Sequence, residues 1–347
     1  MPAAVPGGQR HVLHDPERPG PPLRGELAAG PTGPRYHRPS RRSGTLSAGV
    51  DGPGPFVPER NSGFLLFSPD AVGSGHQRFA LLHLASLGIR AKGVAVVRPT
   101  PEQIAALYGK NRRGRPPEAE DLLVDRLFAA GPSLAYWLVF DGRPETPSLT
   151  DTLRVLKGPS DPAGCLPGHL RHILGAENRL MNGVHSSDSP EEASAELDAL
   201  GVTEFGAVPA ATDGAAPNRP SSALSVACLV RRRVLDAVHV TAVPEVDALQ
   251  VRAQELAARR TKSAVTLRAL DELWERQHAL VERARPRDWR AVTDCLAEVA
   301  EVCSKRFDPD ALGAAVAPFG VRPTDWEDLV LRCQAATGVP AAWRALA

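Results

Sequence analysis

The chain has 347 residues, of which 43% are hydrophobic, and a formal net charge of +1 at pH 7. This length and composition allow two domains with apolar cores, while the near-zero charge excludes a strong overall field that would attract nucleic acid or a membrane surface. No segment approaches the roughly 18 apolar residues of a membrane span. The five cysteines show no close metal-ligand spacing, which is typical of a reduced, cytoplasmic chain.

Residues 1–60 are rich in proline, glycine and arginine and show almost no apolar periodicity. Such a segment buries too little apolar surface to offset the entropy that it would lose on ordering. We therefore predict a disordered tail.

Between residues 61 and 200 the apolar pattern alternates between strand and helix periods. The expected elements are a strand at 64–67, an amphipathic helix through Phe79, Leu82 and Leu87, a strand at 89–97, a helix from Pro101 to Tyr108, a helix at about 121–130, a strand at 133–140, a helix at about 147–156, a loop at 157–167, a short helical turn, a strand before His185 and a helix from Pro190. This order favours an α+β fold, a ferredoxin-like antiparallel sheet sandwich with its helices on one face.

Residues 201–222 are rich in glycine, proline, alanine and serine and predict a linker. From 223 to 347 apolar residues recur at helical spacing between prolines, so we expect a small all-α helical bundle. Its tryptophans either fill the core, which is the preferred interpretation, or mark a surface for a protein partner. They are Trp274, Trp289, Trp326 and Trp343.

The start of the helix at Pro190 is marked by a capping box, with Ser189 as N-cap and Glu192 three residues later. His185 comes shortly before this start, at a junction of strand and helix. Unpaired backbone N–H groups at such junctions bind phosphate.

Glu196 shares the apolar stripe of this helix with Ala193, Leu197 and Leu200. A buried carboxylate needs a partner, and an imidazole held by a carboxylate keeps its other nitrogen free as a nucleophile. His185 is the candidate. The spacing alone does not exclude a solvated loop histidine with Glu196 at the rim.

The segment from Asn182 to Glu196 resembles the active-site signature of nucleoside diphosphate kinases. That signature is N-x-x-H-x-S-D with a glutamate eleven residues after the histidine, and here it is matched by Asn182, His185, Ser187, Asp188 and Glu196. Upstream, Arg154, Gly158, Ser160, Pro162 and Arg171 resemble the family's R-x-x-x-G-x-T-x-P and its later arginine, and Tyr108 lies where the family has a tyrosine. The resemblance covers about residues 63–200.

The resemblance implies a phosphotransferase that moves the γ-phosphate of ATP to a nucleoside diphosphate through a phosphohistidine at His185. Glu196 and Ser187 would orient the imidazole, and Asp188 would lie near a Mg²⁺ ion held mainly by the phosphates. Phosphate and nucleotide contacts would come from Arg154, Ser160, Arg171, Asn182 and Tyr108. Family membership also implies a homo-oligomer.

Two departures from the family pattern leave an alternative open. Ser68 stands where the family's K-P-D-G-V has a phosphate-contacting lysine, and the segment Gly109–Leu123 replaces a short aromatic lid. Loss of one preorganised charge slows such a reaction by about 100- to 1000-fold. The alternative is a catalytically weakened nucleotide-binding protein whose helical module recruits a partner.

An RNA-binding ferredoxin-like module is a third hypothesis, and it requires exposed aromatic residues on neighbouring strands. Phe64 and Phe67 are three positions apart and are expected in the core. We therefore expect no nucleic-acid partner.

Overall fold

The computed structural model describes residues 59–109, 118–140, 148–209, 219–259, 263–286, 288–304 and 306–338. All described residues belong to one unit of the chain, Val50–Ala347. Apart from its last two positions, the tail predicted at 1–60 lies outside the described residues. None of the described helices is long and apolar enough to cross a membrane.

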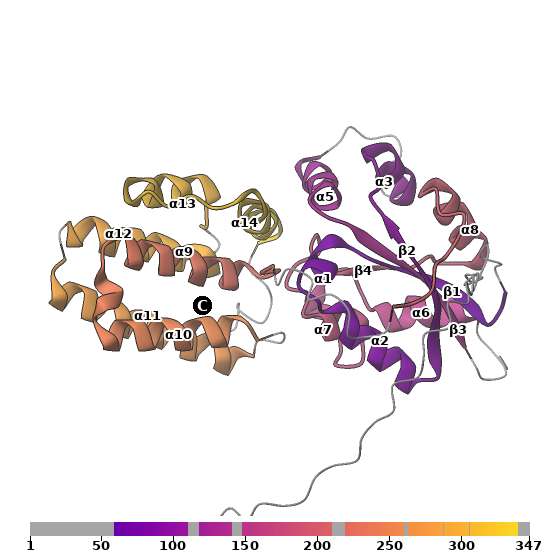
Figure 1. Ribbon diagram of the computed structural model, residues 1–347, viewed down its shortest axis with the longest axis horizontal. Helices are drawn as coiled ribbons and strands as arrows, with labels where there is room; N and C mark the ends of the chain where they lie inside the picture. Colours follow the sequence, from indigo (N-terminus) through magenta and orange to yellow (C-terminus); the bar gives the residue numbers. More distant parts are fainter. Residues whose placement is uncertain are drawn as a thin grey trace, which may run out of the picture. The chain divides into compact units, whose positions relative to one another are not determined.

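The described residues contain a four-stranded antiparallel sheet. Its strands are β1 (Ser62–Phe67), β2 (Ile89–Val97), β3 (Ser133–Phe140) and β4 (Val184–His185), in the spatial order β2-β3-β1-β4 (Figure 1). The predicted strands at 89–97 and 133–140 have these same bounds. The predicted α+β class with an antiparallel sheet is confirmed.

Helices cover both faces of this sheet, so the expectation of one helical layer is wrong (Figure 1). Leu65 and Phe67 face one layer, and Phe64 and Leu66 face the other. The physical reason is that the apolar residues of β1, from Phe64 to Phe67, are continuous instead of alternating, and such a strand must be covered on both sides. Because Phe64 and Phe67 are both buried, these two strand aromatics offer no surface for RNA bases.

The helices of this part of the chain follow the sequence signals closely. On one face lie α1 (Pro69–Gly73), α2 (Gln77–Ser86), α6 (Leu149–Lys157) and α7 (Leu170–Leu174), and on the other α3 (Pro101–Leu107), α5 (Ala119–Ala129) and α8 (Pro190–Ala199). Thr100 and Gln103 form the capping box expected at the start of α3. Caps were predictable because they depend on residues three positions apart.

The buried face of α2 differs from the predicted one. Ala80 and Leu84 are fully buried, whereas Leu82 is 67% exposed and Leu87 is 43% exposed. The helix carries leucines around its circumference, so its apolar period did not define one face. Packing against β2 chose the face that contains the small Ala80.

The predicted linker 201–222 begins with residues that belong to the sheet core. Val202 and Phe205 are buried, and the Phe205 ring lies 6.0 Å from the Trp137 ring. Gly206 and Val94 exchange two backbone hydrogen bonds of 3.0 Å. Residues 210–218, in the middle of the predicted linker, lie outside the described residues.

The C-terminal part of the chain is all-helical, as predicted. Its helices are α9 (Ala223–Ala237), α10 (Pro244–Ala257), α11 (Ala264–Ala284), α12 (Trp289–Ala300), α13 (Pro309–Val316) and α14 (Asp325–Thr337). The expected capping box of Thr324 and Glu327 starts α14. Trp274 and Trp326 are buried, Trp289 is partly exposed and Trp343 lies outside the described residues, so core filling is confirmed for two of the tryptophans.

We predict that Phe205→Ala destabilises the protein by about 3–5 kcal/mol, because it removes a buried aromatic side chain from a packed core. The matched control is Leu82→Ala, which truncates an exposed side chain and should change stability by less than about 0.5 kcal/mol. Urea denaturation followed by circular dichroism measures both. Equal midpoints for the two variants would show that the residues after 200 do not contribute to this core.

Candidate active site

His185 is held on a short edge strand next to the most buried strand of the sheet. It pairs with Leu66 of β1, and Val184 pairs with Phe67. Gly183, just before β4, has a φ of 78° and lies so close to Leu174 that a Cβ atom would approach that side chain to 2.9 Å. A glycine is therefore needed where the chain turns into the strand.

The imidazole of His185 forms a hydrogen bond with Glu196 on α8. Nε2 lies 2.9 Å from a carboxylate oxygen of Glu196, and the Ser187 hydroxyl donates to the same oxygen. The side chains of His185 and Glu196 are only 17% and 14% exposed. A carboxylate is an acceptor, so it favours the tautomer with the proton on Nε2 and leaves the Nδ1 lone pair available.

Helix α8 directs Glu196 toward the sheet because its apolar side is buried. Ala193 and Leu197 lie in the core on either side of Glu196 in the sequence. Ser189 accepts the backbone N–H of Glu192 at 3.2 Å, as predicted for the N-cap. The Glu192 carboxylate accepts a hydrogen bond from the Asp188 N–H at 3.2 Å, one residue before the position that a capping box predicts.

Two aromatic rings flank His185. The Tyr108 ring meets it edge-on with 5.7 Å between centroids, and the Phe64 ring lies 6.3 Å away. Tyr108 is the C-cap residue of α3, so the end of that helix positions it. These rings limit the directions from which a substrate can approach the imidazole.

Arg171 on α7 lies behind the strand that carries His185. It is buried, and its guanidinium donates to the carbonyl oxygens of Gly158 at 2.6 Å and Val184 at 3.3 Å. Its Nε has no hydrogen-bond partner among the described residues. Burial lowers the pKa of Arg171 from its usual value, and the nearby Tyr108 opposes this shift.

Gly158 connects this arginine to the end of α6. It has a φ of 81°, and a Cβ atom there would lie 2.8 Å from the His169 ring. A side chain at this position would therefore displace the loop whose carbonyl holds Arg171. A glycine at position 158 is therefore required by the backbone conformation and by the close approach of His169.

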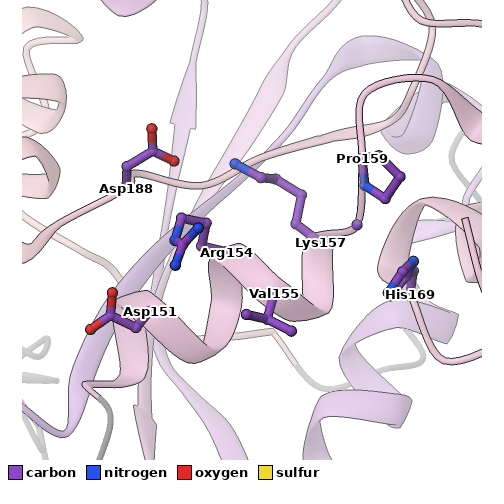
Figure 2. A pocket seen from close by; sticks show the side chains of 8 residues that line it. Asp151, Arg154, Val155, Lys157, Pro159, His169 and Asp188 are labelled. Carbon is purple, nitrogen blue, oxygen red and sulfur yellow. The ribbon is translucent and has the colours of Figure 1, made fainter. Parts of the chain in front are cut away.

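An open groove with a volume of about 570 Å³ lies along the end of α6. Arg154 and Asp188, both identified from the sequence, line it together with Lys157 (Figure 2). His185 is not among the lining residues. Lys157 connects the groove to the strand of His185, because its ammonium donates a hydrogen bond of 2.8 Å to the carbonyl oxygen of Ser186, the next residue.

Sequence reasoning missed Lys157. Its ammonium is partly buried, and burial lowers its pKa to about 8, with a further lowering from Arg171 and Arg154 and an opposing effect of Asp188 and Glu196. The available signal was a lysine at a helix end in a chain where arginine is the usual cation.

Two of the predicted contacts are not brought into this arrangement. Ser160 is exposed and does not line the groove, and the Asn182 amide donates to the carbonyl oxygen of Arg179 at 2.8 Å. Most of the altered lid, residues 110–117, lies outside the described residues. Within the described ranges, no cluster of three histidine, cysteine or acidic side chains could hold a metal ion by itself.

Comparison with known proteins gives the same assignment for this part of the chain. The family model described as nucleoside diphosphate kinase matches residues 61–200. A nucleoside diphosphate kinase from Thermomicrobium roseum is 33% identical over 133 residues, which cover 38% of this chain and 82% of that protein. One from Moorella thermoacetica is 31% identical over 132 residues, covering 38% of this chain and 87% of that protein.

Among solved structures, an Aquifex aeolicus nucleoside diphosphate kinase aligns with 40% of this chain and 93% of its own, at 25% identity and a TM-score of 0.33. The family assignment depends on the sequence matches, which span most of each relative. Through residues 61–200, the chain belongs to the nucleoside diphosphate kinase family.

Proposed function

We propose that this chain is a phosphotransferase that moves the γ-phosphoryl group of a nucleoside triphosphate to a nucleoside diphosphate through a phosphohistidine at His185. The hydrogen bond between His185 Nε2 and Glu196 is the observation that supports this most directly. It orients a histidine and leaves the opposite nitrogen available as a nucleophile.

In the first half-reaction, Nδ1 of His185 attacks the γ-phosphorus, and the bond from that phosphorus to the bridging oxygen of the β-phosphate breaks. The nucleoside diphosphate leaves with that electron pair. A second diphosphate then attacks the phosphohistidine with a terminal oxygen and regenerates the neutral imidazole. Glu196 stabilises the imidazolium character that develops during transfer, and Ser187 holds the carboxylate in place.

Phosphate oxygens would be held by Arg154, which lines the groove, and by Arg171, whose Nε is unpaired within the described residues. Ser160, Asn182 and Tyr108 remain proposed nucleotide contacts, since side chains in such loops adjust on binding. Asp188 is exposed at the groove, as suits an ion held by one carboxylate and substrate phosphates. Mg²⁺ bound there would neutralise charge on the phosphates.

We further propose that Ser68 replaces the phosphate-contacting lysine of the family. Its hydroxyl donates to Asp70, and its side chain is buried, so this position supplies no cation to the groove. This observation favours the second candidate function, a nucleotide-binding protein with weakened catalysis whose helical module at 223–347 recruits a partner.

The division into domains 61–200 and 223–347, the homo-oligomer and the cytoplasmic location remain predictions.

Incubation with γ-labelled ATP and Mg²⁺ should give the wild-type protein an acid-labile phosphate that is transferred to added GDP. His185→Ala should accept no label, because it lacks the nucleophile. His278→Ala, on α11 in the helical part, is the matched control and should be labelled normally. Absence of label on the wild type would favour the second candidate, and equal label on His185→Ala would exclude His185 as the phosphate carrier.

Glu196→Gln should slow phosphohistidine formation by about 10- to 100-fold, the usual effect of removing a group that orients a functional histidine. An amide cannot favour one imidazole tautomer as a carboxylate does, and it stabilises the imidazolium less. Glu191→Gln, on the exposed side of the same helix, should react at the wild-type rate. Rapid-quench measurement of labelling gives both rates, and an unaffected Glu196→Gln protein would remove the proposed role of the carboxylate.

A further inference from the structure

Lys157 ends α6 beside the backbone that carries His185. Its ammonium donates to the carbonyl oxygen of Ser186 at 2.8 Å, and Gly158 turns the chain away immediately afterwards. An ammonium group has three N–H donors. Among the described residues, the Ser186 carbonyl is its hydrogen-bond acceptor, so donors remain for a ligand.

The surroundings of Lys157 are unusual for a structural cation. The ammonium is partly withdrawn from water, and no carboxylate of the described residues forms a salt bridge with it. Two cations and two carboxylates act on its charge. They are Arg154 on its own helix, Arg171 on α7, Asp188 just before α8 and Glu196 within α8. Withdrawing a cation from water without an ion pair destabilises a fold, and groups with such perturbed environments cluster at functional sites.

The groove provides the space for such an anion. Figure 2 shows the Lys157 ammonium extended toward the side where Asp188 and the Arg154 guanidinium lie, away from Pro159 and His169. Two other titratable groups of the groove, Asp151 and His169, have local partners. Asp151 accepts a hydrogen bond from the Ser148 hydroxyl at 2.7 Å, and Nδ1 of His169 accepts the Leu166 N–H at 3.0 Å.

Lys157 and Ser68 bond to backbone carbonyls on opposite sides of His185 in the sequence. The Ser68 N–H donates to the carbonyl oxygen of Gly183 at 3.2 Å, two residues before His185, and Lys157 bonds to the residue that follows it. Both positions therefore contact the backbone that carries His185. Position 68 has a serine that donates to Asp70, whereas position 157 has an ammonium.

We propose that Lys157 contacts the phosphate that His185 receives and supplies the cation that position 68 lacks. This inference depends on the proposed function for the identity of the ligand, a nucleoside triphosphate. When the phosphates enter the groove, the ammonium donates to a phosphate oxygen, either in place of its hydrogen bond to the Ser186 carbonyl or in addition to it. It then stabilises the charge that shifts onto the phosphate oxygens during transfer.

The direct test is Lys157→Met, which keeps the length of the aliphatic stem and removes the charge. Labelling of His185 from γ-labelled ATP at pH 7 should slow by about 100- to 1000-fold, as for other preorganised charges in such sites. Lys92→Met is the matched control and should react normally, because Lys92 lies on strand β2, with its ammonium 4.4 Å from the centre of the Trp137 ring, and does not line the groove. Lys157→Arg, which keeps a cation, should recover part of the lost rate.

The thermal stability of Lys157→Met distinguishes the loss of a phosphate contact from damage to the fold. The pKa of Lys157 falls from 10.5 to about 8 in the folded chain, so its protonated form destabilises the fold at pH 7 and stability rises as the pH increases from about 8 toward 10.5. Lys157→Met should therefore melt at or above the wild-type temperature. A clearly lower melting temperature would contradict the electrostatic environment described above.

The pH dependence provides a second readout. Below pH 8 the ammonium is charged, so kcat/KM, which reports the free enzyme, should decline as the pH rises from about 8 to 10. Lys157→Arg should lack this decline because arginine stays protonated. The same decline in both proteins would assign the titration to another group.

Nucleotide binding distinguishes failure of this inference from failure of the proposed function. Isothermal titration with a non-hydrolysable ATP analogue should show about 10- to 100-fold weaker binding to Lys157→Met, and adenosine binding should be unchanged. If the wild type accepts no label but this difference appears, the kinase proposal fails and the phosphate contact stands. If the wild type is labelled and Lys157→Met matches it in labelling and binding, the kinase proposal stands and Lys157 is not a contact.

Discussion

The hydrogen bond between His185 and Glu196 requires two elements to be placed independently. His185 lies on an edge strand of two residues that pairing with β1 holds in place, and Glu196 lies on a helix whose rotation is set by burial of Ala193 and Leu197. A shift of β4 by one residue would turn the imidazole to the other face, and a shift of α8 by one residue would rotate the carboxylate by about 100°. The polar site thus depends on apolar packing on both faces of β1.

Two cations that bond to the backbone beside the histidine, Arg171 and Lys157, are held by carbonyl oxygens. Arg171 donates to the carbonyls of Gly158 and Val184, and Lys157 donates to that of Ser186. Carbonyl oxygens satisfy the N–H donors but carry no full negative charge, so the positive charge remains available to an anion. The pKa values of Arg171 and Lys157 are both lowered for this reason, because burial without an ion pair disfavours the charged form.

The hydrogen bonds that orient the histidine are separate from those of Ser68. The histidine, the carboxylate and the buried arginine form one connected set through β4, α8 and α7. Ser68 belongs to a separate hydrogen-bonded pair with Asp70 at the start of α1. The Ser68 side chain therefore takes no part in the hydrogen bonds that orient His185.

Local sequence information was enough for the strands β2 and β3, the N-caps of α3, α8 and α14, and the helical stripe that carries Glu196, because each of these depends on residues within one or two turns. Contacts between distant segments could not be derived in this way. Four features depend on which surfaces meet after the chain folds. They are the exposure of Leu82, the second helical layer, the packing of Phe205 on Trp137 and the position of Lys157 beside Ser186. Apolar periodicity identifies a face that must be buried, but only the folded neighbours determine what covers it and which charges lie close enough to act together.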